Sequence, residues 1–309
     1  MKVAVTGANG FVGKALCRYL ATAGYDVHAL TTSTSTFVSS NITYHLINSP
    51  PSVTDLQSVL SGVSVVVHLA GLAHNQSVLS KYRFFSLFYS ANICYAKSLA
   101  VACVAANIRR IVFVSSHGVN SIISSTDLDF PNNYTISKLL SESIFQISSF
   151  CSSLEYVILR PPLVYSSACP GNLSRLARLF SFVPLNVFGA FNARRSFISL
   201  DNLLEVLRIS ISSPSVANNI YEVADPSPVS VAMLANAFYA NSSTPKLSKF
   251  LSRLAFALIR PVILLFPFGR KLLCDSIVES TRFVVDSGWR PRSEHSPPIS
   301  LSGLFSADD

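Results

Sequence analysis

The chain has 309 residues, of which half are hydrophobic and 13% are charged, and its formal net charge is +8. This length allows one large domain, or one domain with a smaller lobe. Its Lys and Arg residues are scattered without a basic block, which argues against a nucleic-acid-binding protein and fits phosphorylated ligands.

Cysteine spacing and apolar runs give no sign of a secreted or membrane-spanning protein. The six cysteines lie far apart with no C-x-x-C pair, so we expect a reduced, cytoplasmic chain without a metal site. The longest apolar run, residues 254–269, is interrupted by Arg260 and Pro261 and is shorter than the ~18 residues of a membrane span. Such sparse charge suggests that part of the surface is covered in an oligomer or touches a membrane loosely.

The first residues form a pattern typical of a dinucleotide-binding site. A short β-branched run enters a loop with Gly7, Gly10 and Gly13, and apolar residues then recur at helical intervals. In such a loop the first glycine makes the tight turn, the second lets the backbone approach the phosphates, and the third lets the helix pack on the strand. The helix N-terminus then faces the anion. Ala8 and Ala15 exclude a nucleoside-triphosphate loop, which needs a glycine and a Ser or Thr at these positions.

The next segments alternate between strands and helices, which predicts an α/β fold with a doubly wound parallel sheet. Beyond Ser166 the alternation gives way to loops, short helices and an isolated strand near residues 221–223. We therefore expect a dinucleotide-binding domain at residues 1–165 and a smaller mixed α/β substrate lobe at 166–309, with the chain crossing back to the sheet near 196–225. The expected strands are 26–30, 43–47, 63–69, 110–114 and 156–159, and the expected helices are 55–60, 87–106 and 134–150.

The end of the second expected strand leaves the choice of dinucleotide open. NAD sites carry an acidic residue there and NADP sites a basic one, but this chain has Thr31 and Thr32. No Lys or Arg occurs between Arg18 and Lys81, which disfavours a dedicated NADP site without proving NAD. The strand at 63–69 ends in small residues that would let a cofactor lie across the sheet, and we interpret His68 there as structural.

Tyr134 and Lys138 are four residues apart, so they share one face of the expected helix. A tyrosine with a pKa near ~10 is a poor base at neutral pH, and a neighbouring ammonium together with the positive nicotinamide ring lowers that pKa. Ser116, at the end of the strand 110–114, could hold the same substrate oxygen. This group would let Tyr134 take a hydroxyl proton as hydride leaves the substrate carbon. A Y-x-x-x-K pattern alone occurs by chance in many proteins. Its position after the glycine loop and after a strand that ends in serine is what favours a catalytic function here.

Together these motifs resemble the extended short-chain dehydrogenase/reductase family, in its NAD-dependent sugar epimerase/dehydratase group. The resemblance extends to Leu159-Arg160-Pro161 with Val164-Tyr165, and to Gly288-Trp289-Arg290-Pro291. It implies a Rossmann-type domain, a catalytic Ser116, Tyr134 and Lys138, bound NAD (NADP not excluded), and a homodimer formed by the helices 87–106 and 134–150. The implied cofactor-binding residues are Gly7, Asn9, Gly10, Phe11, Val12, Gly13, Thr31, Leu69, Ala70, Gly71, Asn92, Ser115, Tyr134, Lys138 and Pro161.

The resemblance also implies contacts with a nucleotide-diphosphate sugar, through Ser116, His117, Asn172 and Arg195. Gly171-Asn172-Leu173 resembles the segment whose asparagine contacts the diphosphate, and Arg195 matches the arginine that reaches the same phosphates. A guanidinium fork suits a diphosphate better than an ammonium does. The alternative is that Asn172 caps a helix and Arg195 is a surface charge.

Departures from the family pattern narrow the expected reaction. Family 4,6-dehydratases carry an Asp-Glu pair where this chain has His117 and Gly118, so dehydration is not expected. The pair Val119-Asn120, with Arg160-Pro161-Pro162, is similar to the subgroup that acts on UDP-N-acetylhexosamines in bacterial surface-polysaccharide synthesis. We expect an NAD(P)-dependent 4-epimerase of a UDP-hexose or UDP-N-acetylhexosamine that forms a transient 4-keto intermediate. The alternatives are a 4-keto reductase or dehydrogenase with net redox turnover, and a non-catalytic NAD(P)-binding sensor.

Residues 251–273 are the most apolar part of the second half. Pro261 should divide any helix there into two short pieces. We expect these pieces to pack on the substrate lobe and cover the sugar site. The alternative is that one piece rests on a membrane surface, with its basic residues at the headgroups.

Overall fold

The computed structural model describes residues 1–34, 39–72, 86–124, 133–166, 191–240, 251, 254–258, 261 and 274–292. The chain divides into two compact units that interleave along the sequence. The first comprises Met1–Pro161, Leu204–Val223 and Thr281–Trp289, and the second comprises Pro162–Leu203, Ala224–Ser280 and Arg290–Asp309. The first unit therefore receives two later segments, and the sequence analysis expected a return only in the region of the earlier one.

A seven-stranded parallel sheet forms the centre of the first unit, in the order β10-β6-β5-β4-β1-β2-β3. Strand order reverses direction at the junction of β1 and β4, which confirms the doubly wound, Rossmann-type architecture. All four residues of β4 are buried, as expected of a central strand covered on both faces. The strands are β1 (Lys2–Thr6), β2 (Asp26–Thr31), β3 (Ile42–Leu46), β4 (Val65–His68), β5 (Arg110–Val114), β6 (Glu155–Arg160) and β10 (Asn219–Glu222).

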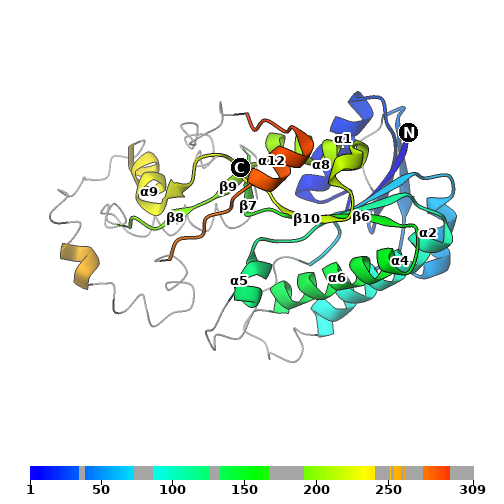
Figure 1. The fold of residues 1–309 in the computed structure, drawn as a ribbon, viewed down its shortest axis with the longest axis horizontal. Helices are drawn as coiled ribbons and strands as arrows, with labels where there is room; N and C mark the ends of the chain where they lie inside the picture. Colours follow the sequence, from blue (N-terminus) through cyan, green and yellow to red (C-terminus); the bar gives the residue numbers. More distant parts are fainter. Residues whose placement is uncertain are drawn as a thin grey trace. The chain divides into compact units, whose positions relative to one another are not determined.

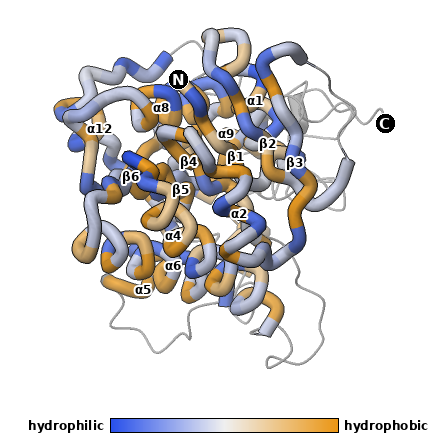
Figure 2. The backbone as a smooth tube through the Cα atoms, turned by 90° about the vertical axis from the view of Figure 1, so that its right-hand side faces the viewer, coloured by the Kyte–Doolittle hydropathy of each residue, from blue (hydrophilic) through white to orange (hydrophobic). Residues whose placement is uncertain are grey.

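Helices cover both faces of this sheet (Figure 1). One face carries α1 (Phe11–Thr22), α12 (Thr281–Ser287) and the part of α8 (Leu200–Ser212) that belongs to the first unit. The other face carries α2 (Val53–Leu60), the π-helical turn η1 (Tyr89–Cys94) continuing into α4 (Tyr95–Ala105), and α6 (Asn133–Phe150). The apolar colouring of the central strands between these layers is visible in Figure 2.

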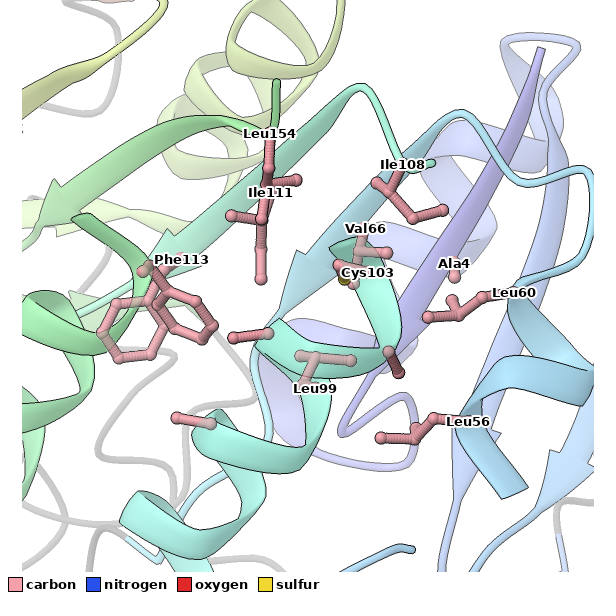
Figure 3. Close-up of a cluster of buried hydrophobic side chains, with 14 of the residues drawn as sticks. Ala4, Leu56, Leu60, Val66, Leu99, Cys103, Ile108, Ile111, Phe113 and Leu154 are labelled. Atoms are coloured by element: carbon pink, nitrogen blue, oxygen red, sulfur yellow. The ribbon is translucent and has the colours of Figure 1, made fainter. Parts of the chain in front are cut away.

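The core on the second of these faces joins two helices to the sheet (Figure 3). Leu56 and Leu60 of α2 and Leu99 of α4 pack over Val66 and Ile111, and all five side chains are fully buried. The helix that includes α4, Ser86–Ala105, is the one described helix long and apolar enough to cross a membrane, with a mean hydropathy of 1.3. Half of it is buried, as in a helix of a protein core.

Two elements differ from the sequence analysis. The expected loops and short helices after Ser199 include the 13-residue helix α8, whose residues Leu203, Val206 and Leu207 are buried. The strand near 221–223 is not isolated, because β10 pairs in parallel with β6 as the edge strand of the main sheet. Its pairing joins residues that are 62 positions apart in the sequence, which no local pattern reveals.

The return of Thr281–Trp289 to the first unit has a clear packing reason. Phe283 of α12 is fully buried and makes edge contacts with the rings of Tyr221 and Trp289, at centroid distances of 5.1 and 5.8 Å. The Tyr221 hydroxyl donates a hydrogen bond to Asp286 at 2.7 Å. This aromatic cluster holds α12 beside β10.

The second unit contains two small ladders and a helix. Strand β7 (Leu163–Tyr165) pairs in parallel with β9 (Phe197–Ser199), β8 (Arg194–Arg195) pairs antiparallel with β11 (Val229–Ser230), and α9 spans Val231–Ala240. Asp225 is buried and accepts hydrogen bonds from the Tyr165 hydroxyl at 2.7 Å and the Asn202 amide at 2.7 Å. Of the apolar segment 251–273, residues 252–253, 259–260 and 262–273 lie outside the described residues, so its expected packing remains a prediction.

Candidate active site

The glycine loop between β1 and α1 is packed so closely that side chains are excluded. Gly7 has φ +68°, and a Cβ there would lie 2.7 Å from the backbone N of Ala70. A Cβ on Gly13 would lie 2.2 Å from the carbonyl oxygen of Gly7. Gly10 caps α1 without a side-chain hydrogen bond, and the first turn of the helix holds no acidic residue. The N–H groups at Phe11 and Val12 are therefore placed to bind an anion such as a pyrophosphate.

Asn9 connects this loop to the end of β2. Its Nδ2 donates to the carbonyl and the hydroxyl oxygen of Ser33, at 2.9 and 3.0 Å, and the Thr31 hydroxyl donates to the same carbonyl at 2.6 Å. The Asn9 Oδ1 atom is buried and has no hydrogen-bond partner among the described residues. An unpaired buried acceptor fits a ligand hydroxyl. The glycine cradle and this acceptor together fit a dinucleotide, whereas Thr31 shapes the loop through Ser33.

The end of β4 is organised by a buried histidine. The Thr6 hydroxyl lies 2.7 Å from His68 Nδ1 and accepts a hydrogen bond from the backbone N of Ala70 at 3.2 Å. The His68 ring is enclosed by Tyr95, Phe113 and Phe145. Burial lowers the pKa of His68 to about 3, and the charge of Lys138 acts in the same direction. A neutral, enclosed imidazole agrees with the structural role expected for His68.

Asn92 and Gly71 lie where β4 approaches the catalytic helix. A Cβ on Gly71 would lie 3.2 Å from Asn92 Oδ1 and 3.5 Å from Lys138 Nζ. Asn92 Oδ1 accepts from the backbone N of Leu72 at 2.7 Å, while Nδ2 donates to the Ser137 hydroxyl at 2.8 Å. The buried amide therefore ties the residues after β4 to α6. Asn92, named above as cofactor-binding, holds other site residues in place, and the π-helical turn η1 presents it there.

Tyr134, Lys138 and Ser116 come together at the carboxyl end of β5. Ser116 follows this strand, and its side chain lies close enough to Tyr134 to act on the pKa of the phenol. Lys138 Nζ donates to the Val114 carbonyl at 2.8 Å and lies 5.9 Å from the centroid of the Tyr134 ring. Burial lowers the pKa of Lys138 to about 8.

The pKa of Tyr134 differs from the sequence-based expectation. Burial raises it, and the hydrogen bond with Ser116 acts in the opposite direction. Burial withdraws the phenol from water and disfavours its charged form, so the lowering expected from Lys138 and the nicotinamide ring has to act against this cost. The Lys138 ammonium is directed to the Val114 carbonyl.

His117 is held by two elements beside Ser116. Its backbone N donates to the Pro161 carbonyl at 2.9 Å. Pro161, which we expect to bind the cofactor, therefore also holds the turn after Ser116 in place. Its Nδ1 lies 2.9 Å from Glu222 Oε1 at the end of β10. Asn120 of α5 (Gly118–Ser124) donates to the same oxygen. The side chain is 21% exposed, and no hydrogen bond to Nε2 occurs within the described residues.

In the second unit, Arg195 of β8 presents an unsatisfied donor. Its Nε atom is buried without a hydrogen-bond partner among the residues described. Burial lowers the pKa of Arg195, while Cys274 and Asp275 act in the opposite direction. Such a group suits an anionic ligand rather than a solvated surface charge. Asn172 lies outside the described residues, so its expected contact with substrate stays a prediction.

Three polar residues of the site were not identified from the sequence: Glu142, Asn120 and Glu222. Glu142 had a usable signal, because it lies four residues after Lys138 and therefore on the same face of α6. Glu222 had none, because its contact with His117 spans 105 positions.

Comparison with known proteins places these features in a family context. The sequence profile described as NAD dependent epimerase/dehydratase family matches residues 3–224. A UDP-glucose 4-epimerase of Vibrio cholerae is 27% identical over 249 residues, which cover 74% of this chain and 72% of that protein. A 2-alkyl-3-oxoalkanoate reductase of Stenotrophomonas maltophilia is 25% identical over 271 residues, covering 82% and 79% of the two chains.

Solved structures share the fold over the whole chain. A UDP-glucuronic acid 4-epimerase from Bacillus cereus in complex with NAD superposes with a TM-score of 0.73 and 17% identity, covering 99% of this chain and 96% of the other. A UDP-N-acetylglucosamine 4-epimerase from the same organism gives a TM-score of 0.69 with 19% identity and full coverage of both chains. At these identities the likeness establishes the architecture.

Proposed function

Because the chain belongs to the NAD dependent epimerase/dehydratase family, we propose that it inverts C4 of a UDP-hexose or UDP-N-acetylhexosamine through a transient 4-keto intermediate. It is an NAD-dependent enzyme of the short-chain dehydrogenase/reductase type. The observation that carries the proposal is that Ser116, Tyr134 and the buried Lys138 meet at the carboxyl end of β5. The glycine cradle and the unpaired Asn9 Oδ1 fit the dinucleotide that the family requires.

The proposed chemistry divides the work among three side chains. When bound, NAD supplies the hydride acceptor and a positively charged ring that favours the phenolate of Tyr134. Tyr134 Oη takes the proton of the substrate 4-hydroxyl and returns it in the reverse step. The Ser116 hydroxyl holds the same oxygen, and the Lys138 ammonium stabilises the negative charge that develops there. Inversion requires the keto sugar to present its other face before hydride returns.

The residues after Ser116 support substrate binding rather than elimination of water. His117 and Gly118 replace the acid and base expected of a 4,6-dehydratase. With Nδ1 held by Glu222 at 2.9 Å, the Nε2 atom of His117 is the ring position open to a second substrate oxygen. We therefore assign His117 a binding role in this proposal.

The function is tested by analysing the purified protein and its products. Absorbance and mass spectrometry should find NAD bound to the isolated protein, because an epimerase regenerates it within each turnover. NMR should then detect the 4-epimer when UDP-glucose or UDP-N-acetylglucosamine is added without external cofactor. Stoichiometric consumption of NADH would instead indicate a reductase, a candidate raised by the similarity to the Stenotrophomonas maltophilia enzyme. Bound NAD without conversion of either sugar nucleotide would indicate a sensor.

Arg195→Met should raise the KM for the UDP-sugar about 10–100-fold with a smaller change in kcat. The guanidinium would lose charge-assisted hydrogen bonds to phosphate, each contributing about 1.5–3 kcal/mol. The matched control is Arg194→Met, because this neighbouring side chain is 60% exposed and pairs only loosely with Asp275 at 3.9 Å. Steady-state kinetics with the UDP-sugar measure KM and kcat for both variants. Equal effects of the two substitutions would make Arg195 an ordinary surface charge.

We also propose that the protein is a homodimer joined through η1, α4 and α6. These helices carry exposed apolar side chains: Tyr89, Val101, Val104, Leu140, Ile147 and Phe150. Covering them would remove apolar area from water.

Ile147→Asp should weaken the dimer at least about 100-fold, because a charge would enter the apolar centre of the interface. The control is Val285→Asp, which places the same charge on an exposed residue of α12, on the opposite face of the sheet. Sedimentation equilibrium measures both constants. A wild-type protein that stays monomeric at all concentrations would contradict the dimer.

A further inference from the structure

The catalytic residues are divided between a strand end and a helix. Ser116 follows β5, whereas Tyr134 and Lys138 belong to α6. Their hydrogen bonds depend on the distance between these two elements. Lys138 spans it once, through its bond to the Val114 carbonyl. A second connection lies one helical turn further along α6, at Glu142.

Glu142 is buried, with 1% of its side chain exposed, and both its oxygens are occupied. Oε1 accepts from the Ser115 hydroxyl and from Arg160 Nε at 3.0 Å, and Oε2 accepts from Arg160 Nη2 at 2.5 Å. Ser115 lies between Val114, whose carbonyl accepts from Lys138, and Ser116, whose side chain acts on Tyr134. The carboxylate therefore grips the strand end at the residue between the two catalytic contacts. Arg160 extends the connection to α5, by donating to Asn120 Oδ1 at 2.6 Å.

The same carboxylate lies one helical turn from Lys138 on α6 and acts on its charge. The groups that face Lys138 are Tyr134 and Glu142 on α6, His68 on β4, and Arg160 on β6 behind Glu142. His68 is neutral, and its pKa of about 3 keeps it so at any working pH. Burial lowers the pKa of Lys138 to about 8, and Glu142 acts against this lowering.

We propose that Glu142 is a positioning residue, whose carboxylate holds the strand end that carries Ser116 against α6 and places a compensating negative charge one helical turn from Lys138. Glu142 itself does not touch the reacting atoms in this assignment. Its bond to Ser115 fixes the position of the strand end, and its negative charge favours the charged form of Lys138. The inference rests on the proposed roles of Ser116, Tyr134 and Lys138.

Its electrostatic part is tested by titrating Lys138 without any substrate. In protein labelled with ¹³C at lysine Cε, the Lys138 signal is identified as the one missing from Lys138→Met. We expect a midpoint near pH 8 in the wild-type protein. The Glu142 carboxylate favours the charged form of Lys138, so its removal should lower the pKa of Lys138. We therefore expect Glu142→Gln to move the midpoint lower by at least about half a pH unit. An unchanged midpoint would overturn the electrostatic role whatever reaction the enzyme performs.

Glu155→Gln is the matched control. Glu155 is also a carboxylate paired with an arginine of β5, but it lies at the opposite end of the sheet strands from Val114. It should lower stability without moving the Lys138 midpoint. If Glu142→Gln does not fold, the double variant Glu142→Gln/Arg160→Gln removes both members of the ion pair. Its Lys138 midpoint should fall as well, and an unchanged value contradicts the proposal.

The geometric part is tested by Ser115→Ala, which removes the bond to Glu142 and leaves every charge in place. We expect kcat to fall about 10-fold with little change in KM and none in the Lys138 midpoint. The alkaline limb of the kcat profile should move to lower pH in Glu142→Gln only. A wild-type kcat in Ser115→Ala would remove the geometric role. If no sugar nucleotide is converted by the wild-type protein, the proposed function fails and the titration still decides the electrostatic part.

Discussion

Tyr134→Phe is expected to lower the turnover of the UDP-sugar about 10³-fold while leaving NAD bound. The substitution removes the one oxygen proposed to carry the substrate proton, and general acid–base groups typically contribute 10²–10⁴-fold. The ring stays in its packing against Phe88, at a centroid distance of 6.3 Å, so the fold should be unaffected. Single-turnover kinetics with the NAD-loaded protein measure the chemical step directly.

Tyr19→Phe provides the control for this substitution. The Tyr19 hydroxyl donates to Glu205 Oε2 at 2.5 Å, and Tyr19 lies on α1, away from Ser116 and Lys138. This variant should turn over at the wild-type rate. A Tyr134→Phe enzyme within tenfold of wild type would exclude Tyr134 from proton transfer, and loss of bound NAD would assign it a role in holding the cofactor.

Arg110→Met should destabilise the protein by about 3–5 kcal/mol, the largest stability effect that we expect. Arg110 begins β5, and its side chain is fully buried. Nε donates to Glu155 Oε2 at 2.8 Å, while Nη1 donates to the Ser210 and Ser213 carbonyls at 2.9 and 2.6 Å. These carbonyls lie at the C-terminal end of α8, where a cation is favourable. Methionine fills the space but leaves both carbonyls without their donor and the carboxylate with only the half-exposed Arg109.

The neighbouring arginine offers a matched comparison in chemical denaturation. Arg109 also pairs with Glu155, at 3.3 Å, but its side chain is 42% exposed. Arg109→Met should therefore cost no more than about 1 kcal/mol. If Arg110→Met yields only insoluble protein, Arg110→Lys can be measured instead, because it keeps the charge but lacks the guanidinium group. Its loss of stability should lie between those expected for Arg109→Met and Arg110→Met. Equal unfolding midpoints for the Arg109 and Arg110 variants would contradict this account.

Agreement between sequence and structure is best where the signal is local. The glycine spacing at positions 7, 10 and 13 depends on a turn that packs against the first helix, and steric exclusion at Gly7 and Gly13 explains it. Likewise, the four-residue spacing of Tyr134 and Lys138 places both on one face of α6. The alternation of strand-like apolar runs with helix-like periodic segments was enough to predict the parallel sheet, because buried strands and covering helices have different hydrophobic periods.

The pKa values and hydrogen-bond partners of individual side chains could not be predicted from the sequence, because they depend on the residues packed around them. The sequence suggested a tyrosine with a lowered pKa, yet burial raises it, because the desolvation of a side chain depends on everything packed around it. Asn92 was assigned to the cofactor from its motif, which stays a prediction, and only the structure shows that its amide also bonds Leu72 and Ser137. A residue's hydrogen-bond partners are set by the elements that meet it in space.

The sequence by itself determined the fold class, the dinucleotide cradle and the Ser116–Tyr134–Lys138 group, since each is encoded in residues close together or in the order of successive strands. Only the tertiary structure decided that β10 closes the edge of the sheet, that Thr281–Trp289 returns to it, and that Glu142 bonds Ser115 and Arg160 beside the proposed catalytic group. The physical reason is the range of the interactions. Hydrophobic period and turn geometry act over a few residues, whereas the ion pair of Glu142 with Arg160 and the contact of Glu222 with His117 form between residues 18 and 105 positions apart.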